Sequence, residues 1–410
     1  MCRILAYSLL VWPLLLSAAC DRPQESSGAG IVVDTLPGGT VLVDNPSEGL
    51  WEQTGEDWRP VEELRIGGAD GEGPEVFGQI RDLVVDDAGR THTLDSQARE
   101  VRVFDGDGRH LRTLGGPGEG PGELADPNGL AVDPRGRLWV SDPANGRYSV
   151  FDGDGTFVES HTRRVGGFGF WWEGTFDDEG RLLDPSRAGD PTGSGTRRHL
   201  VRHELRHGEL VQVDSVPMPP EGAVTEPAAV EIPLESDGHQ FVSIPFIPQA
   251  VWTVGPGGRL LFGAGDSYRI HERALAGDTL RTVRRSRSPD PVTREDVEAA
   301  VDAHRDDVPD RALRGLEEAI PETRPHFETL FTDDAGYLWV GRATAGEGTE
   351  GDQGDRSTFD VFDPEGRFLG EVRLGVALTP TPEVAGSRVV GVHQDALGVP
   401  HVVVYRLNGR

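Results

Sequence analysis

One pattern occurs twice without a gap, first as DLVVDDAGRTHTLDSQAREVRVFDGDGR (Asp82–Arg109) and then as GLAVDPRGRLWVSDPANGRYSVFDGDGT (Gly129–Thr156). The second copy starts 47 residues after the first. Self-similarity at such a period is typical of propellers and solenoids, in which each repeat is one small sheet. Each copy is predicted to form four short strands. A D-x-x-G-R turn follows the first strand, and a D-G-D-G hairpin turn follows the third.

The D-x-x-G-R turn also counts the repeats along the chain. It recurs, intact or degenerate, at six places: 86–90, 133–137, 177–181, 255–259, 333–337 and 395–398. Six turns predict six blades. The sixth unit is short of strands, whereas Gly39–Asp44 and Val61–Gly67 are strand-like and have no blade of their own. We therefore expect both N-terminal segments to complete the last blade, because closing the ring removes its exposed sheet edges.

A family resemblance is carried by the run GGPGEGPGEL (Gly115–Leu124) and by DPNGLAVDPRGRLWVSDPANGRYSVFDGDG (Asp126–Gly155). These segments resemble NHL repeats, and roughly Thr35–Arg410 is similar to bacterial six-bladed β-propeller proteins, many of which are secreted. The resemblance implies an all-β, six-bladed propeller. NHL-type propellers bind proteins, RNA or small molecules, and a minority are enzymes.

Composition agrees with many short strands joined by tight turns, since the 410 residues include 55 Gly and 30 Pro. The formal net charge is −29, which repels a phosphate backbone, so we do not expect nucleic acid as a partner. The two cysteines, Cys2 and Cys20, both precede the repeats, and this rules out a disulfide framework in the predicted propeller.

The N-terminus is predicted to be an export signal. Arg3 precedes the apolar run Ile4–Leu16, which is too short to span a membrane comfortably as a mature helix. The small residues that end at Cys20 resemble a bacterial lipoprotein signal, which implies cleavage before this cysteine and its lipidation. The bulky aliphatic residue lies four positions before Cys20, where the family more often has it at three. An ordinary signal cleaved after Ala19 is the alternative.

The chain is therefore predicted to have three parts. Residues 1–19 are the signal peptide, 20–34 a flexible polar tether, and 35–410 the propeller. We expect the protein to be exported and lipid-anchored to a bacterial membrane, where it faces the periplasm or the cell exterior.

One segment, 292–321, departs from the strand pattern. Thr293 is a plausible N-cap with Asp296 three residues later, and apolar residues then recur at helical spacing. A second short helix is predicted from Asp310 to Ile320, where Pro321 ends it. The segment lies between blades four and five.

The apolar stripe of this helical insert must rest on another surface. We expect it to lie over part of the channel mouth, near Trp172 and Glu328, as a lid or a ledge for partner docking. A decoration packed on the outer rim is the alternative.

A candidate site follows from counting eight residues back from each turn glycine, which reaches the start of each inner strand. Those positions are Arg81, Asn128, Trp172, Ala250, Glu328 and Val390, with Trp171, Gln249 and His326 as neighbours. The mixture of aromatic, amide and charged groups suits a small-molecule or peptide pocket. The predicted ligand-binding residues are Arg81, Asn128, Trp171, Trp172, Gln249, His326 and Glu328. Alternatively, these side chains only close the channel by packing and hydrogen bonding.

The leading interpretation is a binding module for a protein, peptide or carbohydrate ligand, with the membrane reached through lipidated Cys20. A second hypothesis is a lactonase-like hydrolase or lyase that holds a divalent cation in the channel. Asn128 and Glu328 are suitable ligand types for a metal, whereas Arg81 and Trp172 are not. The sequence requires no cofactor, and the G-x-S-x-G and H-E-x-x-H motifs are missing. A purely structural scaffold is a third interpretation, so enzyme activity stays open.

Overall fold

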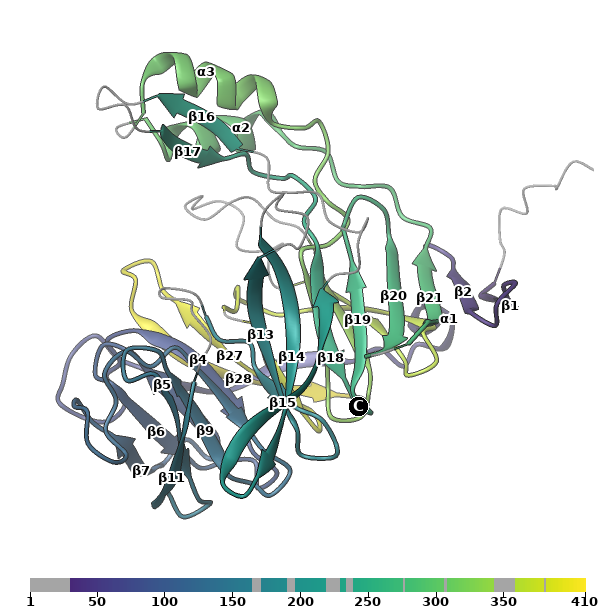
Figure 1. Cartoon of the computed structure of the whole chain (residues 1–410). Helices are drawn as coiled ribbons and strands as arrows, with labels where there is room; N and C mark the ends of the chain where they lie inside the picture. Colours follow the sequence, from purple (N-terminus) through teal and green to yellow (C-terminus); the bar gives the residue numbers. More distant parts are fainter. Residues whose placement is uncertain are drawn as a thin grey trace, which may run out of the picture.

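The computed structural model describes residues 30–163, 171–189, 196–218, 229–233, 239–275, 277–305, 308–342, 358–379 and 381–410. Six sheets, each with four antiparallel strands at its centre, form the blades of the predicted β-propeller (Figure 1). The predicted signal peptide and Cys20 lie outside the described residues. Three helices occur in the described ranges, and none of them is long and apolar enough to cross a membrane.

The first three blades each consist of four consecutive strands, which follow one another from the channel outward. Blade one contains β4 (Ile80–Val85), β5 (Thr91–Asp95), β6 (Glu100–Phe104) and β7 (His110–Gly115). Blade two contains β8 (Gly129–Val132), β9 (Leu138–Asp142), β10 (Arg147–Phe151) and β11 (Phe157–Thr162). Blade three contains β12 (Thr175–Phe176), β13 (Leu182–Gly189), β14 (Thr196–Arg206) and β15 (Glu209–Met218).

Blades four and six also contain N-terminal strands, whereas blade five again has four consecutive strands. Blade four contains β18 (Val251–Gly255), β19 (Arg259–Gly263), β20 (Arg269–Ala274) and β21 (Thr279–Arg285), extended by β2 (Val41–Asn45) and β1 (Val32–Thr35). Blade five contains β22 (Thr329–Thr332), β23 (Leu338–Gly341), β24 (Thr358–Phe362) and β25 (Phe368–Arg373). Blade six contains β26 (Glu383–Ala385), β27 (Arg388–Gln394), β28 (Pro400–Asn408) and β3 (Arg59–Ile66).

The D-x-x-G-R turn works through its first and fourth residues. Asp86 Oδ1 accepts the backbone N–H groups of Ala88 (3.0 Å) and Arg90 (2.9 Å), and Gly89 adopts φ 73°, a left-handed conformation that glycine enters without steric cost. The Arg90 Nε donates to Asp86 Oδ2 at 2.7 Å. The same carboxylate pattern recurs at Asp105, Asp133, Asp152, Asp177, Asp333, Asp363 and Asp395. The motif therefore marks a β-hairpin, but not which hairpin of a blade.

The sixth blade shows this limit. Asp395 and Gly398 lie between β27 and β28, the second and third strands of the blade, rather than between its first and second. The counterpart of the counted turn is the short connection around Gly386, which joins β26 to β27. The number of blades is as predicted, but counting back from Gly398 is wrong. It reaches Val390, which is buried on β27 instead of lying at the start of the inner strand.

The ring closes through one of the two N-terminal segments. The prediction for Val61–Gly67 is confirmed, because β3 pairs antiparallel with β28 and supplies the outer strand of blade six. The prediction for Gly39–Asp44 is wrong, since β2 pairs in parallel with β21 of blade four. Strand periodicity identifies a strand but does not identify its partner. A free outer edge was available on both blades, and the first described strand, β1, begins at Val32, within the expected tether.

The N-terminal strap, residues 41–66, runs along the outside of three consecutive blades. Asn45 is 1% exposed and bridges blades four and five: its Nδ2 donates to the carbonyls of Arg284 and Gly366, each at 3.0 Å, and its Oδ1 accepts from the Phe368 N–H at 2.8 Å. Helix α1 (Leu50–Thr54) then packs its buried Trp51 against β25. The strap ends as β3 of blade six, so it links the blades that complete the ring.

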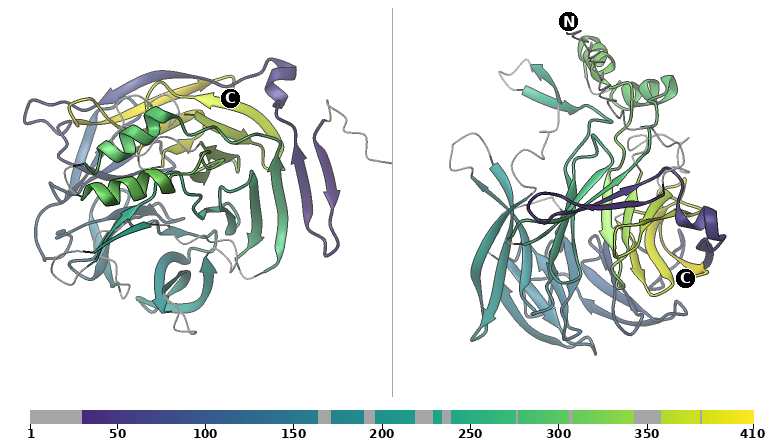
Figure 2. Two further views of the ribbon diagram at one scale, coloured as in Figure 1. Left: turned by 90° about the horizontal axis from the view of Figure 1, so that it is seen from above. Right: turned by 90° about the vertical axis from the view of Figure 1, so that its right-hand side faces the viewer.

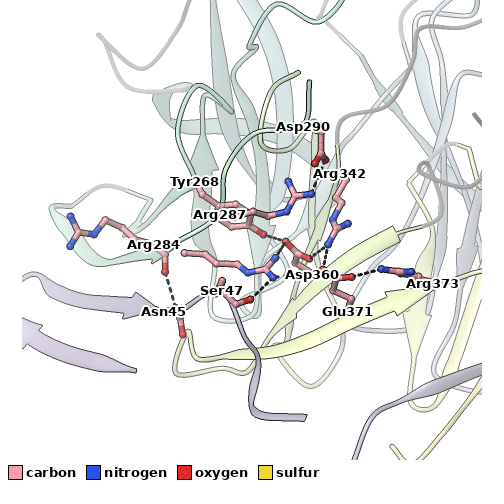
Figure 3. Close-up of polar contacts among 11 residues, drawn as sticks. Asn45, Ser47, Tyr268, Arg284, Arg287, Asp290, Arg342, Asp360, Glu371 and Arg373 are labelled. Atoms are coloured by element: carbon pink, nitrogen blue, oxygen red, sulfur yellow. Dashed lines mark hydrogen bonds and ion pairs between the residues drawn. The ribbon is translucent and has the colours of Figure 1, made fainter. Parts of the chain in front are cut away.

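A buried polar cluster joins blades four and five beneath this strap (Figure 3). Asp360 is fully buried and is bonded by the Tyr268 hydroxyl, by Arg285 and by Arg342. Arg285 also donates to the Ser47 carbonyl at 2.9 Å and lies 3.7 Å from the centre of the Phe368 ring. A buried carboxylate needs such partners. The cluster is therefore explained by a structural role at the interface between the two blades.

The helical insert contains α2 (Arg294–Asp302) and α3 (Asp310–Ala319), where the sequence predicts helices. Thr293 and Asp296 form the predicted capping box. The prediction that the apolar stripe of these helices rests on the channel mouth is wrong. Residues such as Leu313 and Leu316 pack on the hairpin of β16 (Ala229–Pro233) and β17 (His239–Ser243). Helices and hairpin form a lobe that stands above the blades, and seen from above the helices lie over the ring (Figure 2).

Candidate functional site

The inner strands of the six blades surround a central channel. Neighbouring inner strands lie side by side where β26 meets β4, β4 meets β8, β8 meets β12, and β18 meets β22. They enclose a cavity of about 620 Å³, whose wall includes Asp82, Trp171, Trp252, Glu328 and Glu383. This volume falls within the usual range for small-ligand pockets.

A second cavity of about 570 Å³ lies at the face of the D-x-x-G-R turns. It shares Val85, Val254, Thr332 and Glu383 with the first cavity, so the two are successive levels of one channel. The turns place acidic side chains around this lower level: Asp86, Asp87, Asp178, Asp333 and Asp334.

A short ledge, Trp171–Glu173, forms one side of the upper level. Its central residue, Trp172, is 4% exposed and fixed at two points: the backbone N–H donates to the Asn128 carbonyl at 3.0 Å, and the indole N–H donates to Asp184 at 2.8 Å. Trp171, in contrast, is 52% exposed on the cavity wall. The buried tryptophan therefore holds the ledge, while the Trp171 side chain remains exposed on the cavity wall.

Asp184 is fixed from the other side of the interface between blades two and three. It is buried and accepts a hydrogen bond from the Tyr148 hydroxyl as well as from Trp172. Burial raises the pKa of Asp184, and the hydrogen bonds from Tyr148 and Trp172 oppose this shift. The carboxyl thus joins an interblade contact to the ledge at the channel.

The channel wall carries carboxylates from four blades. Asp82 accepts the Leu130 N–H at 2.7 Å, and burial raises its pKa to about 8, with Glu383 and Glu173 adding to the shift by repulsion. The Glu383 side chain is exposed to solvent inside the channel. Protein atoms of the surrounding ring nevertheless desolvate its carboxylate, and this raises the pKa of Glu383 to about 7. Glu328 lines the same cavity from blade five.

The structure places some of the predicted ligand residues together. Trp171, Trp172 and Glu328 line the upper cavity, as does Ala250. Trp172 contributes mainly as the anchor of its ledge, whereas Trp171 and Glu328 are exposed. A ligand-binding role for these residues remains a prediction.

Four other predicted residues are not among those that line the cavity in the described part of the chain. Asn128 is buried, and its Oδ1 accepts from the Ser141 hydroxyl at 2.7 Å. His326 packs edge-on against Tyr268 at 5.9 Å, and its pKa is lowered first by burial. Arg81 is half-buried and Gln249 is exposed, and neither is among the residues that line the cavity.

The count missed Asp82, Glu173, Trp252 and Glu383, which do line the cavity. A register shift in the pairing of β4 with β5, between Ile80 and Asp82, explains the first case. An extra residue at a β-bulge reverses which side chains face each side of a strand. Asp82 therefore faces the channel, one position after the predicted Arg81. The position of Asp82 as the first residue of the first repeat was the sequence signal that could have identified it.

The second hypothesis requires a metal site. Within the part of the chain that the structure describes, no three His, Cys, Asp or Glu side chains come together as a set of metal ligands. Asn128, one of the two suggested ligands, directs its amide oxygen to Ser141. The described residues therefore offer no donor set through which to derive metal-assisted chemistry.

No family model and no curated protein matches this sequence. Solved structures do resemble it in fold. A member of the DUF4221 family from Bacteroides vulgatus is 12% identical, with 86% of this chain and 99% of that chain covered and a TM-score of 0.47.

Virginiamycin B lyase from Staphylococcus aureus is 12% identical, with 79% and 94% of the two chains covered and a TM-score of 0.41. A gluconolactonase from Xanthomonas campestris is 15% identical, with 78% and 82% covered and a TM-score of 0.35. At these identities and TM-scores, the likeness carries no argument about function.

Proposed function

We propose that this protein is an exported binding module that holds a segment of a protein, peptide or glycan at its central channel. The observation that carries the proposal is the upper cavity of about 620 Å³ with Trp171, 52% exposed, on its wall. An exposed indole on a rigid support is a common contact for peptides and sugars, because it offers a large flat surface at low entropic cost.

The ledge is preorganised for such contact. Trp172 and Asp184 fix its backbone, so little conformational freedom is lost when a ligand covers Trp171. Loops on a rigid scaffold are the usual place for binding function in folds of this kind. Binding is favoured over the lactonase-like alternative because the described residues provide no metal donor set.

We further propose the lipid anchor at Cys20. Eleven residues separate Cys20 from β1, and they span at most about 40 Å when fully extended. Because β1 lies at the rim of blade four, outside the ring in Figure 2, this rim would stay close to the membrane while the channel remains free.

A binding screen tests the proposed function. End-blocked peptides and oligosaccharides are titrated against the protein by isothermal calorimetry, and each binder is repeated with Trp171→Ala. The matched control is Phe241→Ala, which removes another exposed aromatic, 64% exposed, from the lobe. We expect at least one class to lose binding about tenfold or more with Trp171→Ala only. Binding that is equal in both variants, or no binding in either class, contradicts the proposal.

A further inference from the structure

The described wall of the channel carries acidic side chains and no basic ones. Carboxylates enter the upper cavity from blades one, three, five and six, as Asp82, Glu173, Glu328 and Glu383. Among the described residues that line its two levels, none is an arginine, lysine or histidine, although the chain contains 40 basic residues and 12 histidines. Some arginines of the ring are paired with carboxylates: Arg90 with Asp86, which lines the lower level, and Arg285 with Asp360.

The protein only partly neutralises Asp82 and Glu383. The two oxygens of Asp82 accept backbone N–H groups from Leu83 and Leu130, which carry no net charge. Burial in the ring raises the pKa of Glu383. Like charges held in a narrow channel repel one another, and a positive ligand relieves that repulsion.

Aromatic rings accompany the carboxylates. Trp171 and Trp252 line the same cavity, which Phe331 also borders. The face of an indole attracts a cation, most strongly where water is excluded. A cavity that combines indoles with carboxylates and lacks a basic group on its described wall has the chemistry of a cation site rather than that of an anion site.

We infer that the channel binds the positively charged side chains of a basic peptide segment, with the alkylammonium or guanidinium groups between the carboxylates and the indoles. This inference rests on the proposed function and specifies its ligand class. The net charge of −29 favours the approach of such a peptide. The cavity of about 620 Å³ is large enough for more than one side chain.

Isothermal calorimetry with an end-blocked tetralysine peptide tests the inference, with end-blocked tetraglycine and tetraglutamate as comparison peptides. We expect tetralysine to bind and the other two not to bind. At about pH 9, where Glu383 with its pKa of about 7 is ionised, Glu383→Gln should weaken tetralysine about tenfold, because a unit charge near a ligand inside a protein contributes at least this much. Glu328→Gln serves as a second variant, and circular dichroism confirms that both variants fold.

The matched control is Asp154→Asn, which removes one charge from an exposed hairpin turn between β10 and β11. It should change tetralysine affinity less than twofold. Equal losses in the control and the channel variants would show attraction to the overall charge and overturn the inference. If tetralysine does not bind but another peptide or a glycan binds in a Trp171-dependent manner, the cation claim fails and the proposed function stands. If no ligand depends on Trp171, both fail.

Discussion

Asn45 provides the sharpest test of how the ring is held together. Its amide makes three hydrogen bonds: a partly buried one to the Arg284 carbonyl, and buried ones to the Gly366 carbonyl and from the N–H of Phe368. Asn45→Ala removes all three and leaves buried backbone groups without this partner. Each such loss costs about 1–3 kcal/mol, and since the three share one side chain, we expect a total of about 3–5 kcal/mol.

That cost is a large fraction of the roughly 5–15 kcal/mol stability of a typical domain. The assay is urea unfolding followed by tryptophan fluorescence, with Asn408→Ala as the control, because Asn408 is exposed near the end of β28. The control should change the free energy of unfolding by less than about 0.5 kcal/mol. Hydrogen exchange at the Phe368 amide should accelerate in Asn45→Ala alone. A loss within about 1 kcal/mol of the control would refute the bridging role of the strap.

Three further outcomes are expected. Asp184→Ala should release the Trp172 indole and lower the affinity for any Trp171-dependent ligand several-fold. Unchanged affinity by calorimetry would show that Asp184 is not needed to hold the ledge in place. Asp82 has a pKa of about 8 in the folded protein, above its ordinary value of 3.8, so between these two pH values the folded state binds one proton more than the unfolded state. The stability of the fold should therefore fall as pH rises from about 4 to 8. Asp82→Asn should flatten this part of a profile of melting temperature against pH, and an unchanged profile would show that Asp82 is not the titrating group. Cys20→Ser should release the expressed protein from the membrane fraction or leave it unprocessed, and equal membrane association on immunoblots would contradict the proposed anchor.

The fold was predictable because its signal is local. An aspartate that accepts two backbone N–H groups, followed by a glycine with positive φ, specifies a hairpin wherever it occurs, as at Asp86 and Gly89. Repetition of that hairpin then implies a propeller. The same locality explains the mistake at Asp395, where an identical turn joins a different pair of strands.

Long-range pairing was less predictable. The strand-like pattern of β2 does not distinguish the outer edge of blade four from that of blade six. What selects blade four includes Asn45, whose partners lie more than 200 positions away in the sequence. The support of the helical insert was missed for a similar reason, since β16 and β17 belong to the connection between blades three and four.

Part of the cavity wall could be predicted from the sequence, and its role in ligand binding stays a prediction. Counting from the turns reached the right level of the channel and identified Trp171 and Glu328 on its wall. It could not anticipate the register shift before Asp82 or the short inner strand that carries Glu383. Both depend on the pairing of particular strands, and the acidic character of the channel becomes visible only when the blades are assembled.

Fluorine NMR of the protein labelled with 5-fluorotryptophan tests the central claim most directly. Seven of the eight tryptophans of the sequence follow the predicted signal peptide and give separate reporters, which single Trp→Phe substitutions assign. On addition of end-blocked tetralysine, the resonances of Trp171 and Trp252 should shift in a saturable way, because both line the channel. Those of Trp58 and Trp339, buried between blades five and six, should not move. Saturable shifts confined to tryptophans outside the channel, or no shift at Trp171, would contradict a cation-binding channel.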